Sequence, residues 1–293
     1  MAEQTRSIVI TGASSGIGKA TALRLARRGW RVFAAVRRDA DARALRSESD
    51  GKLETVLLDV ADQASIAAAA QDVTGRLQGR GLDALFNNAG IGTTSPVEFF
   101  PLDKLREMFE INLFGQVAAI QAFLPLLRGA RGRIINTGSV GDYLTPPFGG
   151  ALAASKVAFA SMSAALRMEL RPQGIKVCVL EPGAINTPAV DKTLGTVEKS
   201  ISALPPEGVT LYADAMRAMA STFMKKERAG SPPEAVAEVV ERALTDARPR
   251  IRYAAGKDAT KLKLLGTFLP EKILDVALLR VFGMPKAFLR PTH

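Results

Sequence analysis

The glycine-rich stretch "TGASSGIG", residues 11–18, has the spacing that points most directly to chemistry in this sequence. Gly12 permits a turn that a Cβ atom would crowd, and Gly16 and Gly18 let the backbone approach a pyrophosphate. A strand is predicted before this stretch and a helix after it, and the first N–H groups of such a helix bind phosphate. The order G-x-x-x-G-x-G differs from the G-x-G-x-x-G of most dinucleotide folds. A purely structural turn is the alternative, but the strand and helix on either side favour a phosphate site.

The end of the second predicted strand indicates which cofactor the site would take. An NAD site usually has an acidic residue about 20 residues after the glycines, where the carboxylate binds the ribose hydroxyl. This chain has Arg37 and Arg38 there, in "FAAVRRD". Because guanidinium groups suit a 2′-phosphate, we expect NADP(H) rather than NAD(H). Two solvated surface arginines are the alternative interpretation.

The elements that must position these residues follow from the apolar patterning. Strands are predicted at 7–11, 31–36, 53–60, 82–90 (a strand together with its exit loop), 132–139, 175–183 and 250–256. Helices are predicted at 17–29, 39–48, 63–77, 102–128, 150–171 and 231–246. Continuously apolar strands that alternate with helices are typical of a parallel sheet buried on both faces. We therefore expect an α/β fold: a single Rossmann-type, doubly wound domain with a seven-stranded parallel sheet, helices on both faces and a helical C-terminal tail.

The domain organisation follows from the point where the alternation breaks, after Gly183. Residues 1–255 are predicted to form one dinucleotide-binding domain. Within it, residues 184–230 hold helical pieces between weakly patterned segments, and a long insertion after a strand end is where a substrate lid would lie. Residues 256–293 are predicted to form an amphipathic helical tail.

Composition argues against several classes of protein. The 293 residues include one cysteine, Cys178, and one histidine, His293, so neither an internal disulfide nor a metal site is expected. The net charge of +10 favours anionic partners, yet the basic residues are dispersed and no nucleic-acid-binding motif accompanies them. The start "MAEQTRSIVITG" leads straight into a strand, and no run of about 18 apolar residues occurs. We expect a cytoplasmic protein without a signal peptide or transmembrane helix.

An ordered set of motifs along residues 5–255 resembles the short-chain dehydrogenase/reductase family. The set comprises "TGASSGIG" (11–18), Asp59 in "LLDV", "NNAG" (87–90), Asn112 in "INLFG", Ser139 in "NTGS", Lys156 and "PGAINT" (182–187). The stretch "GSVGDYLTPPFG" is most similar to the branch of 17β-hydroxysteroid and retinol dehydrogenases, which act on lipophilic alcohols and ketones. The resemblance implies an oxidoreductase acting on a hydrophobic alcohol or carbonyl compound.

The resemblance also implies a role for each matching residue. Ser139 would bond the substrate carbonyl, Lys156 would bond the nicotinamide ribose and lower a neighbouring pKa, and Asn112 would hold a water of a proton relay. The implied cofactor-binding set is Gly12, Ser14, Ser15, Gly16, Ile17, Gly18, Arg37, Arg38, Asp59, Val60, Asn88, Ala89, Gly90, Lys156, Pro182, Gly183, Ile185 and Thr187.

One position departs from the family pattern. The family has a tyrosine four residues before the lysine and thirteen after the serine, and both counts arrive at Leu152. Leucine cannot donate a proton, and a general acid typically contributes roughly 10²–10⁴-fold in rate. Three hypotheses stay open. The chain is a redox enzyme with another acid, or with a substrate such as an imine or an activated alkene that needs less help at this position. Otherwise it is a cofactor-binding protein with non-redox chemistry or a scaffold role, or an inactivated form of an ordinary dehydrogenase. Tyr143 is the candidate substitute donor, and a pocket wall is its alternative role.

The substrate pocket is expected to be apolar. Its candidate residues are Ile91, Tyr143, Leu144, Pro147, Phe148, Leu152, Leu194, Met216 and Phe223. The tail segment 261–291 mixes apolar residues with lysine and arginine, so it can dock on the body, on another subunit or on an anionic membrane surface. In the family, helices like those predicted at 102–128 and 150–171 pair between subunits, which implies a homodimer or homotetramer.

Overall fold

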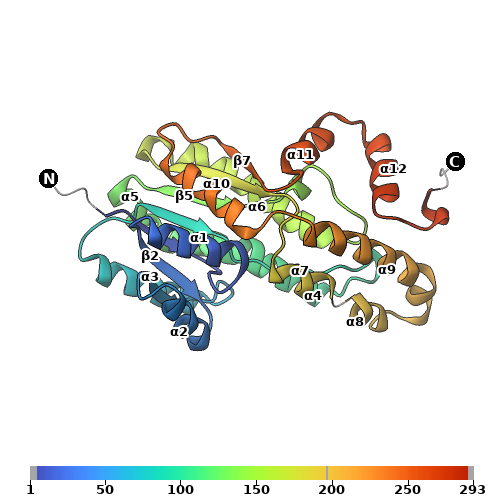
Figure 1. Cartoon of the computed structure of the whole chain (residues 1–293), viewed down its shortest axis with the longest axis horizontal. Helices are drawn as coiled ribbons and strands as arrows, with labels where there is room; N and C mark the ends of the chain where they lie inside the picture. Colours follow the sequence, from blue (N-terminus) through green and yellow to red (C-terminus); the bar gives the residue numbers. More distant parts are fainter. Residues whose placement is uncertain (1–4, 196, 290–293) are drawn as a thin grey trace.

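Seven parallel strands form the centre of the fold in the computed structural model, which describes residues 5–195 and 197–289 (Figure 1). Their order across the sheet is β3-β2-β1-β4-β5-β6-β7, so the predicted seven-stranded parallel sheet is confirmed. The strands are β1 (Ser7–Ile10), β2 (Arg31–Val36), β3 (Glu54–Leu57), β4 (Ala84–Asn87), β5 (Arg133–Thr137), β6 (Lys176–Pro182) and β7 (Arg252–Ala255). The strands β3 and β5 end before their predicted runs do, and β4 ends at Asn87, followed by the predicted exit loop. The residues after these strands enter the loops that build the site.

The strand order reverses at β1 and β4, which pair directly with each other. The strands β2 and β3 follow β1 to one side, and β5, β6 and β7 follow β4 to the other. Connections therefore leave this point in opposite directions, and a crevice forms outside the carboxyl ends of the two strands. In an open α/β sheet this crevice is the expected ligand site.

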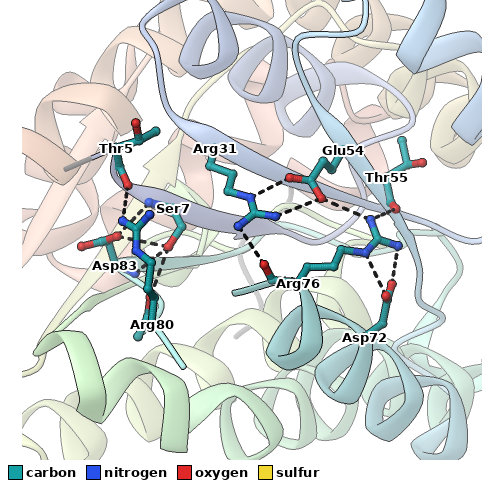
Figure 2. A network of polar contacts seen from close by, with 10 residues as sticks. Thr5, Ser7, Arg31, Glu54, Thr55, Asp72, Arg76, Arg80 and Asp83 are labelled. Atoms are coloured by element: carbon teal, nitrogen blue, oxygen red, sulfur yellow. Dashed lines mark hydrogen bonds and ion pairs between the residues drawn. The ribbon is translucent and has the colours of Figure 1, made fainter. Parts of the chain in front are cut away.

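Polar contacts hold the amino ends of the strands together (Figure 2). Arg31, the first residue of β2, donates from Nε to Oε1 of Glu54, the first residue of β3, at 2.7 Å. Ser7, the first residue of β1, donates its backbone N–H to Asp83, which directly precedes β4, at 2.8 Å. Since these contacts occupy the amino edge of the sheet, the site is left to the opposite, carboxyl edge.

Helices cover both faces of the sheet (Figure 1). Apolar residues of α1 (Gly16–Arg27), α2 (Asp39–Glu48) and α10 (Pro233–Thr245) share one buried core with Ile8 and Ile10 of β1. Residues of α3 (Gln63–Leu77), α5 (Gly115–Ala130) and α6 (Gly150–Glu169) share another core with Val9. Successive strand residues point to opposite faces, so a strand between two helical layers is apolar throughout.

The long helix predicted over 102–128 is interrupted, which corrects the sequence-based expectation. The helix α4 (Leu102–Phe109) runs into a π-helical turn, η2 (Glu110–Phe114), before α5 begins. An added Cβ atom at Gly115 would collide with the carbonyl oxygen of Val60, so glycine lets the start of α5 approach the segment after β3. The π-helical turn carries the fully buried Asn112, and such turns are frequent at functional sites.

The stretch Leu102–Ala130 is, within the described residues, the one helical stretch long and apolar enough to cross a membrane by length and composition. In the fold, 39% of its most apolar window is buried. Ile120, Phe123 and Leu127 of this stretch pack in the core beneath the sheet. Core helices of soluble proteins pass the same test, so the finding is weak evidence for a membrane span.

The segments after β6 and β7 are helical and pack on each other. The segment predicted as a lid forms α7 (Pro188–Leu194), α8 (Val197–Ser202) and α9 (Pro206–Arg228). The tail forms α11 (Ala259–Phe268), α12 (Glu271–Val281) and a 3₁₀ turn, η5 (Lys286–Leu289), and its last four residues, with His293, lie outside the described residues. Phe282 and Met284 of the tail are buried in one cluster with Met216 and Met219 of α9. The tail therefore contributes to the same apolar core as the predicted lid.

Candidate active site

The glycine-rich loop between β1 and α1 is shaped by close contacts with the residues that follow β4. Gly12 and Gly16 have φ angles of +64° and +55°, which side chains rarely adopt. A Cβ atom added at Gly12 would lie 2.8 Å from Ala89 Cα, and one added at Gly18 would lie 2.5 Å from Asn88 Nδ2. The loop therefore forms a cradle that a side chain at these positions would fill or disrupt.

The first turn of α1 completes this cradle. Ser15 is the N-cap residue of α1, and its side chain caps none of the N–H groups there. Ser14 is exposed and Ile17 is half-buried. Uncapped N–H groups and the partial positive charge of a helix start attract anions. A Cβ atom added at Gly16 would lie 3.3 Å from Thr187 Cβ, so the loop after β6 also reaches the cradle. These features fit a dinucleotide pyrophosphate.

The loop after β6 is tied to the end of α9. Pro182 ends β6, and Gly183 packs so closely on the backbone of Lys257 that a Cβ atom would collide with it. Ile185 is buried and donates its backbone N–H to Oε2 of Glu227 at 3.1 Å. Burial raises the pKa of the Glu227 carboxyl to about 7, although the Ile185 N–H favours the ionised form. Sequence reasoning did not single out Glu227.

The two arginines predicted to select the cofactor differ in their surroundings. Arg38 is the N-cap residue of α2, and its guanidinium donates to both carboxylate oxygens of Asp41, each at 2.8 Å. Arg37 is exposed at the carboxyl end of β2. Asp59 follows β3, and its Oδ1 accepts the backbone N–H of Ala61 at 3.0 Å. Val60 is buried. Arg38 is thus engaged by a neighbouring carboxylate, and Arg37 faces solvent.

Asn112 is held inside the protein by three hydrogen bonds. Its Oδ1 accepts the backbone N–H of Ile91 at 2.9 Å, and its Nδ2 donates to the Ile91 carbonyl at 2.9 Å and to Ser155 Oγ at 3.0 Å. Both Nδ2 hydrogens are used in these contacts, and the water-holding role that the resemblance implied for Asn112 stays a prediction. Its contacts fix the loop after β4 against α6, and the partner Ser155 was not predicted.

Lys156 of α6 reaches the end of β5. Its Nζ donates to the carbonyl oxygen of Thr137, the last residue of β5, at 2.9 Å. Burial lowers the pKa of Lys156 to about 8, and the charge of Asp142 acts against this shift. A Cβ atom at Gly90 would lie 3.5 Å from Nζ, so Gly90 contributes to the space around the ammonium group. Leu152 lies one helical turn before Lys156 on the same wall of a cavity.

Ser139 and Asp142 stand together in the loop after β5. The Oγ atom of Ser139 accepts the backbone N–H of Gly141 at 2.9 Å, so its own hydroxyl hydrogen is not used in that bond. Asp142 has a side chain that is 5% exposed, and its Oδ1 has no hydrogen-bond partner within the described residues. Burial raises its pKa to about 6, while the charges of Arg252 and Lys156 oppose the shift. Sequence reasoning missed Asp142, although it lies only three residues after Ser139.

Tyr143 lies elsewhere than predicted. Its hydroxyl donates to Oε1 of the fully buried Glu181 at 2.8 Å. Lys263 of α11 donates to Oε2 of the same carboxylate at 2.8 Å, and Arg252 pairs with it as well. A buried carboxylate needs such partners. Tyr143 is therefore a partner of Glu181 and is not among the residues that line the cavity beside Ser139.

A cavity of about 560 Å³ adjoins Ser139, Leu152 and Lys156. Its apolar wall includes Leu144, Pro146, Pro147 and Ala153 from the β5–α6 region, Met219 and Phe223 from α9, and Leu262, Leu265, Leu278, Val281 and Phe282 from the tail. Of the predicted pocket residues, Leu144, Pro147, Leu152 and Phe223 line this cavity. The tail residues were not predicted to do so, although leucines recur along α11 and α12.

The remaining predicted pocket residues pack outside the cavity lining. Phe148 is buried and meets Tyr212 edge to face, with ring centroids 6.0 Å apart. Leu194 and Met216 are buried in the protein interior, and Ile91 is held by its contacts with Asn112. Apolar type alone did not separate a cavity wall from the core behind it.

Comparisons with known proteins are consistent with this geometry. Residues 6–197 match the family model of short chain dehydrogenases. In the described part of the chain, no group of three or more His, Cys, Asp or Glu side chains could hold a metal ion. Retinol dehydrogenase 16 of Mus musculus is 35% identical over 94% of this chain and 88% of its own length. The 17-beta-hydroxysteroid dehydrogenase type 6 of Mus musculus is also 35% identical, over 96% and 90%.

Solved structures of similar proteins share the fold. A short-chain dehydrogenase from Streptomyces avermitilis is 27% identical, covers 96% of this chain and 97% of its own, and has a TM-score of 0.73. An alcohol dehydrogenase from Thermococcus sibiricus in complex with 5-hydroxy-NADP is 25% identical, covers 85% and 95%, and has a TM-score of 0.65. A protein from Burkholderia phymatum in complex with NAD, 24% identical over 85% and 89%, has a TM-score of 0.72. Both nicotinamide dinucleotides therefore occur among similar folds.

Proposed function

The chain belongs to the short-chain dehydrogenase family, and we propose that it is an NADP(H)-dependent oxidoreductase acting on a hydrophobic alcohol or carbonyl compound. The observation that carries this proposal is the presence of Ser139 and Lys156 in the wall of one largely apolar cavity. Gly90 adjoins the Lys156 ammonium, and the preceding Ala89 packs on Gly12 of the glycine cradle. The cavity and the phosphate cradle thus share one short segment after β4.

Residues of this chain supply a place for the cofactor and for the reacting oxygen. When bound, NADP(H) would supply or accept the hydride at its nicotinamide ring. The hydroxyl hydrogen of Ser139 is available to a substrate oxygen, because Oγ acts as an acceptor toward Gly141. The Lys156 ammonium, held by Thr137, places positive charge on the same wall and stabilises negative charge that develops on that oxygen.

We further propose that proton donation is atypical or impaired, because Leu152 occupies the position one turn before Lys156. Its isobutyl group lines the cavity and cannot donate a proton. An imine or activated alkene as substrate would reduce the demand on a donor at this position. One alternative is a cofactor-binding protein with non-redox chemistry or a scaffold role, and the other is an inactivated form of an ordinary dehydrogenase. Leu152 favours both alternatives, because it cannot donate a proton.

The activity is tested by following NADPH and NADH oxidation at 340 nm with a panel of apolar aldehydes, ketones, imines and activated alkenes. The proposal predicts cofactor oxidation that depends on substrate and falls at least tenfold in Ser139→Ala, with NADPH binding unchanged. NADPH binding with no turnover across the panel, in either direction, would instead support the non-redox or inactivated alternatives.

The preference for NADP(H) is tested at Arg37. This exposed guanidinium at the end of β2 is suited to a 2′-phosphate, and a lost charge-assisted contact corresponds to about 10- to 100-fold in affinity. Arg37→Ala should weaken NADPH binding by that factor and leave NADH binding within about twofold. Arg43→Ala, on the exposed face of α2, is the matched control. Equal loss for both cofactors, or tighter binding of NADH by the unaltered protein, would contradict the preference.

We propose a cytoplasmic location with peripheral membrane contact through the tail. Phe268, Leu264 and Ile273 are exposed on α11 and α12, and Lys272 and Arg280 are exposed near them in the chain. Exposed apolar and basic side chains on helices suit an anionic interface. Co-sedimentation with anionic vesicles should be lost in Phe268→Ser. Vesicle binding that survives this change would contradict membrane contact through the tail.

We also propose self-association through α4, η2 and α6. Leu102, Phe114, Val157, Met162 and Met168 are large apolar side chains exposed on these elements. Light scattering should give a mass of two or four chains, and Phe114→Lys should lower it. A monomer at micromolar concentration would refute this interface.

A further inference from the structure

Besides Lys156, four lysines lie in the lining of the cavity next to Ser139. Lys225 and Lys226 are in the last turn of α9. Lys257 lies in the loop between β7 and α11, and Lys261 lies in the first turn of α11. All four are exposed, and they come from two segments that are distant in the sequence. The fold therefore brings four positive charges into the lining of a largely apolar cavity, and the two segments meet where Lys257 contacts Ala229, the residue after α9.

These ammonium groups have few counter-charges. None of the ion pairs within residues 5–195 and 197–289 uses any of the four, in contrast to Lys263, which pairs with Glu181. Lys257 donates to a backbone carbonyl, that of Ala229, at 3.1 Å. Carboxylates in the lining are limited to Glu227 and Asp258 within those residues. Glu227 already accepts the Ile185 N–H.

The electrostatic balance at the cavity is therefore positive. With Lys156 included, five ammonium groups in the lining face two carboxyl groups, and the pKa of Glu227 is about 7, so this carboxyl is charged only part of the time at neutral pH. Positive charge beside walls of low dielectric attracts anions more strongly than the same charge in open water. A neutral apolar ligand would make no use of it.

The rest of the cavity requires an apolar ligand body. Met219, Phe223, Leu262, Leu278 and Phe282 contribute side chains from three helical segments. The volume of about 560 Å³ lies within the range of cavities that enclose a small organic ligand. Burial of hydrocarbon against these side chains would provide most of the affinity, and the lysines would select the head group.

We propose that this cavity binds an amphiphile with a hydrocarbon body and an anionic head group, which Lys225, Lys226, Lys257 and Lys261 recognise. This inference rests on the proposed function in that the amphiphile would be the substrate, with its reacting carbon toward Ser139 and Leu152. The anion has two sources of the same chemistry: a free carboxylate amphiphile, or the head group of an anionic lipid in a membrane.

The test is a binding experiment on the full chain without cofactor, so it is independent of hydride transfer. Fluorescence titration with cis-parinaric acid is compared with titration by its methyl ester, which keeps the hydrocarbon and removes the charge. We expect the acid to bind at least about tenfold more tightly at low salt, with the difference shrinking as NaCl is added. Equal affinity for acid and ester would overturn the proposal.

Variants locate the effect. Lys225→Gln, Lys226→Gln and Lys261→Gln together should bring the affinities for acid and ester within about twofold, while ester binding persists and reports a folded cavity. Lys52→Gln, an exposed lysine between α2 and β3 outside the lining, is the control and should keep the preference. A triple variant that keeps the preference, or that loses NADPH affinity and keeps acid binding, would refute recognition by these lysines.

A vesicle arm distinguishes the two sources. The unaltered protein and the triple variant are sedimented with phosphatidylcholine vesicles that contain or lack phosphatidylglycerol. Loss of acid binding in the variant with unchanged sedimentation supports a free amphiphile. Loss of phosphatidylglycerol-dependent sedimentation alongside it supports a lipid head group. If neither changes, the proposal fails, and a failure of the redox activity alone would leave it standing.

Discussion

Replacing Leu152 with tyrosine tests whether this position limits the chemistry. Leu152 lies one helical turn before Lys156, and both line the cavity. A Cβ atom added at Gly92 would lie 3.1 Å from Leu152 Cδ2. The Leu152 side chain therefore packs against Gly92 on one side and borders the cavity on the other. A phenol at this position would extend into the cavity near the Lys156 ammonium.

The expected gain follows from the charge and the chemistry at this wall. Because the pKa of Lys156 is about 8, the side chain is mostly charged at pH 7. A neighbouring positive charge lowers the pKa of a phenol and makes it a better proton donor. A positioned general acid contributes roughly 10²–10⁴-fold, which corresponds to about 3–5 kcal/mol of barrier. We therefore expect kcat/KM for ketone reduction to rise by that factor in Leu152→Tyr.

The assay is NADPH oxidation with an apolar ketone from pH 6 to 9, with NADPH affinity measured separately. Leu152→Phe is the matched control, because it has the same ring without the hydroxyl and reports any effect of shape. An equal gain in both variants would refute proton donation as the reason. No gain in Leu152→Tyr with NADPH binding intact would favour a non-redox role for the chain.

Three further predictions concern stability. Lys263→Met removes one partner of the fully buried Glu181 and should lower the free energy of unfolding in urea by about 2 kcal/mol. An unchanged midpoint of urea unfolding would contradict a structural role for this contact. The carboxyl of Glu227 has a folded pKa of about 7, raised by burial from 4.5, so its contribution to stability is complete below pH 4.5 and is lost as pH rises through 7. Glu227→Gln should flatten thermal stability over that interval, and an unaltered pH profile would show that the shift is absent. The buried Phe282 ring lies between the tail and α9, with its centroid 5.8 Å from that of Phe223. Phe282→Ala should therefore lower the free energy of unfolding by about 3–5 kcal/mol, measured by thermal unfolding. A loss below about 1 kcal/mol would mean that the tail is not part of the core.

Local patterns were sufficient for the elements that depend on neighbouring residues. The glycine spacing at residues 12, 16 and 18 predicted a phosphate-type loop, because positive φ angles and close backbone approach are properties of glycine itself. The apolar runs predicted seven strands, because a strand covered on both faces has no polar positions. Ser139 and Lys156 were singled out by the family resemblance, and the apolar patterns placed Ser139 at the end of a strand and Lys156 within a helix.

Long-range contacts decided what the patterns left open. The predicted helix over 102–128 breaks at the π-helical turn that holds Asn112, whose partners Ile91 and Ser155 are distant in the chain. No local signal places Tyr143 on Glu181, because the buried carboxylate that draws it is 38 residues away. Such pairings depend on burial, which is created by the assembled fold.

By itself, then, the sequence determined the β-α alternation, the glycine cradle and the leucine one turn before Lys156, since each rests on residue type and short-range spacing. Tertiary structure decided which apolar residues form a cavity and which form core. Phe148 and Leu152 are both apolar and four residues apart, yet only the second lines the cavity. Phe282, from a tail whose docking site the sequence left open, lines it as well. Hydrophobic burial is non-directional, so which apolar surfaces meet is settled only when distant helices pack together.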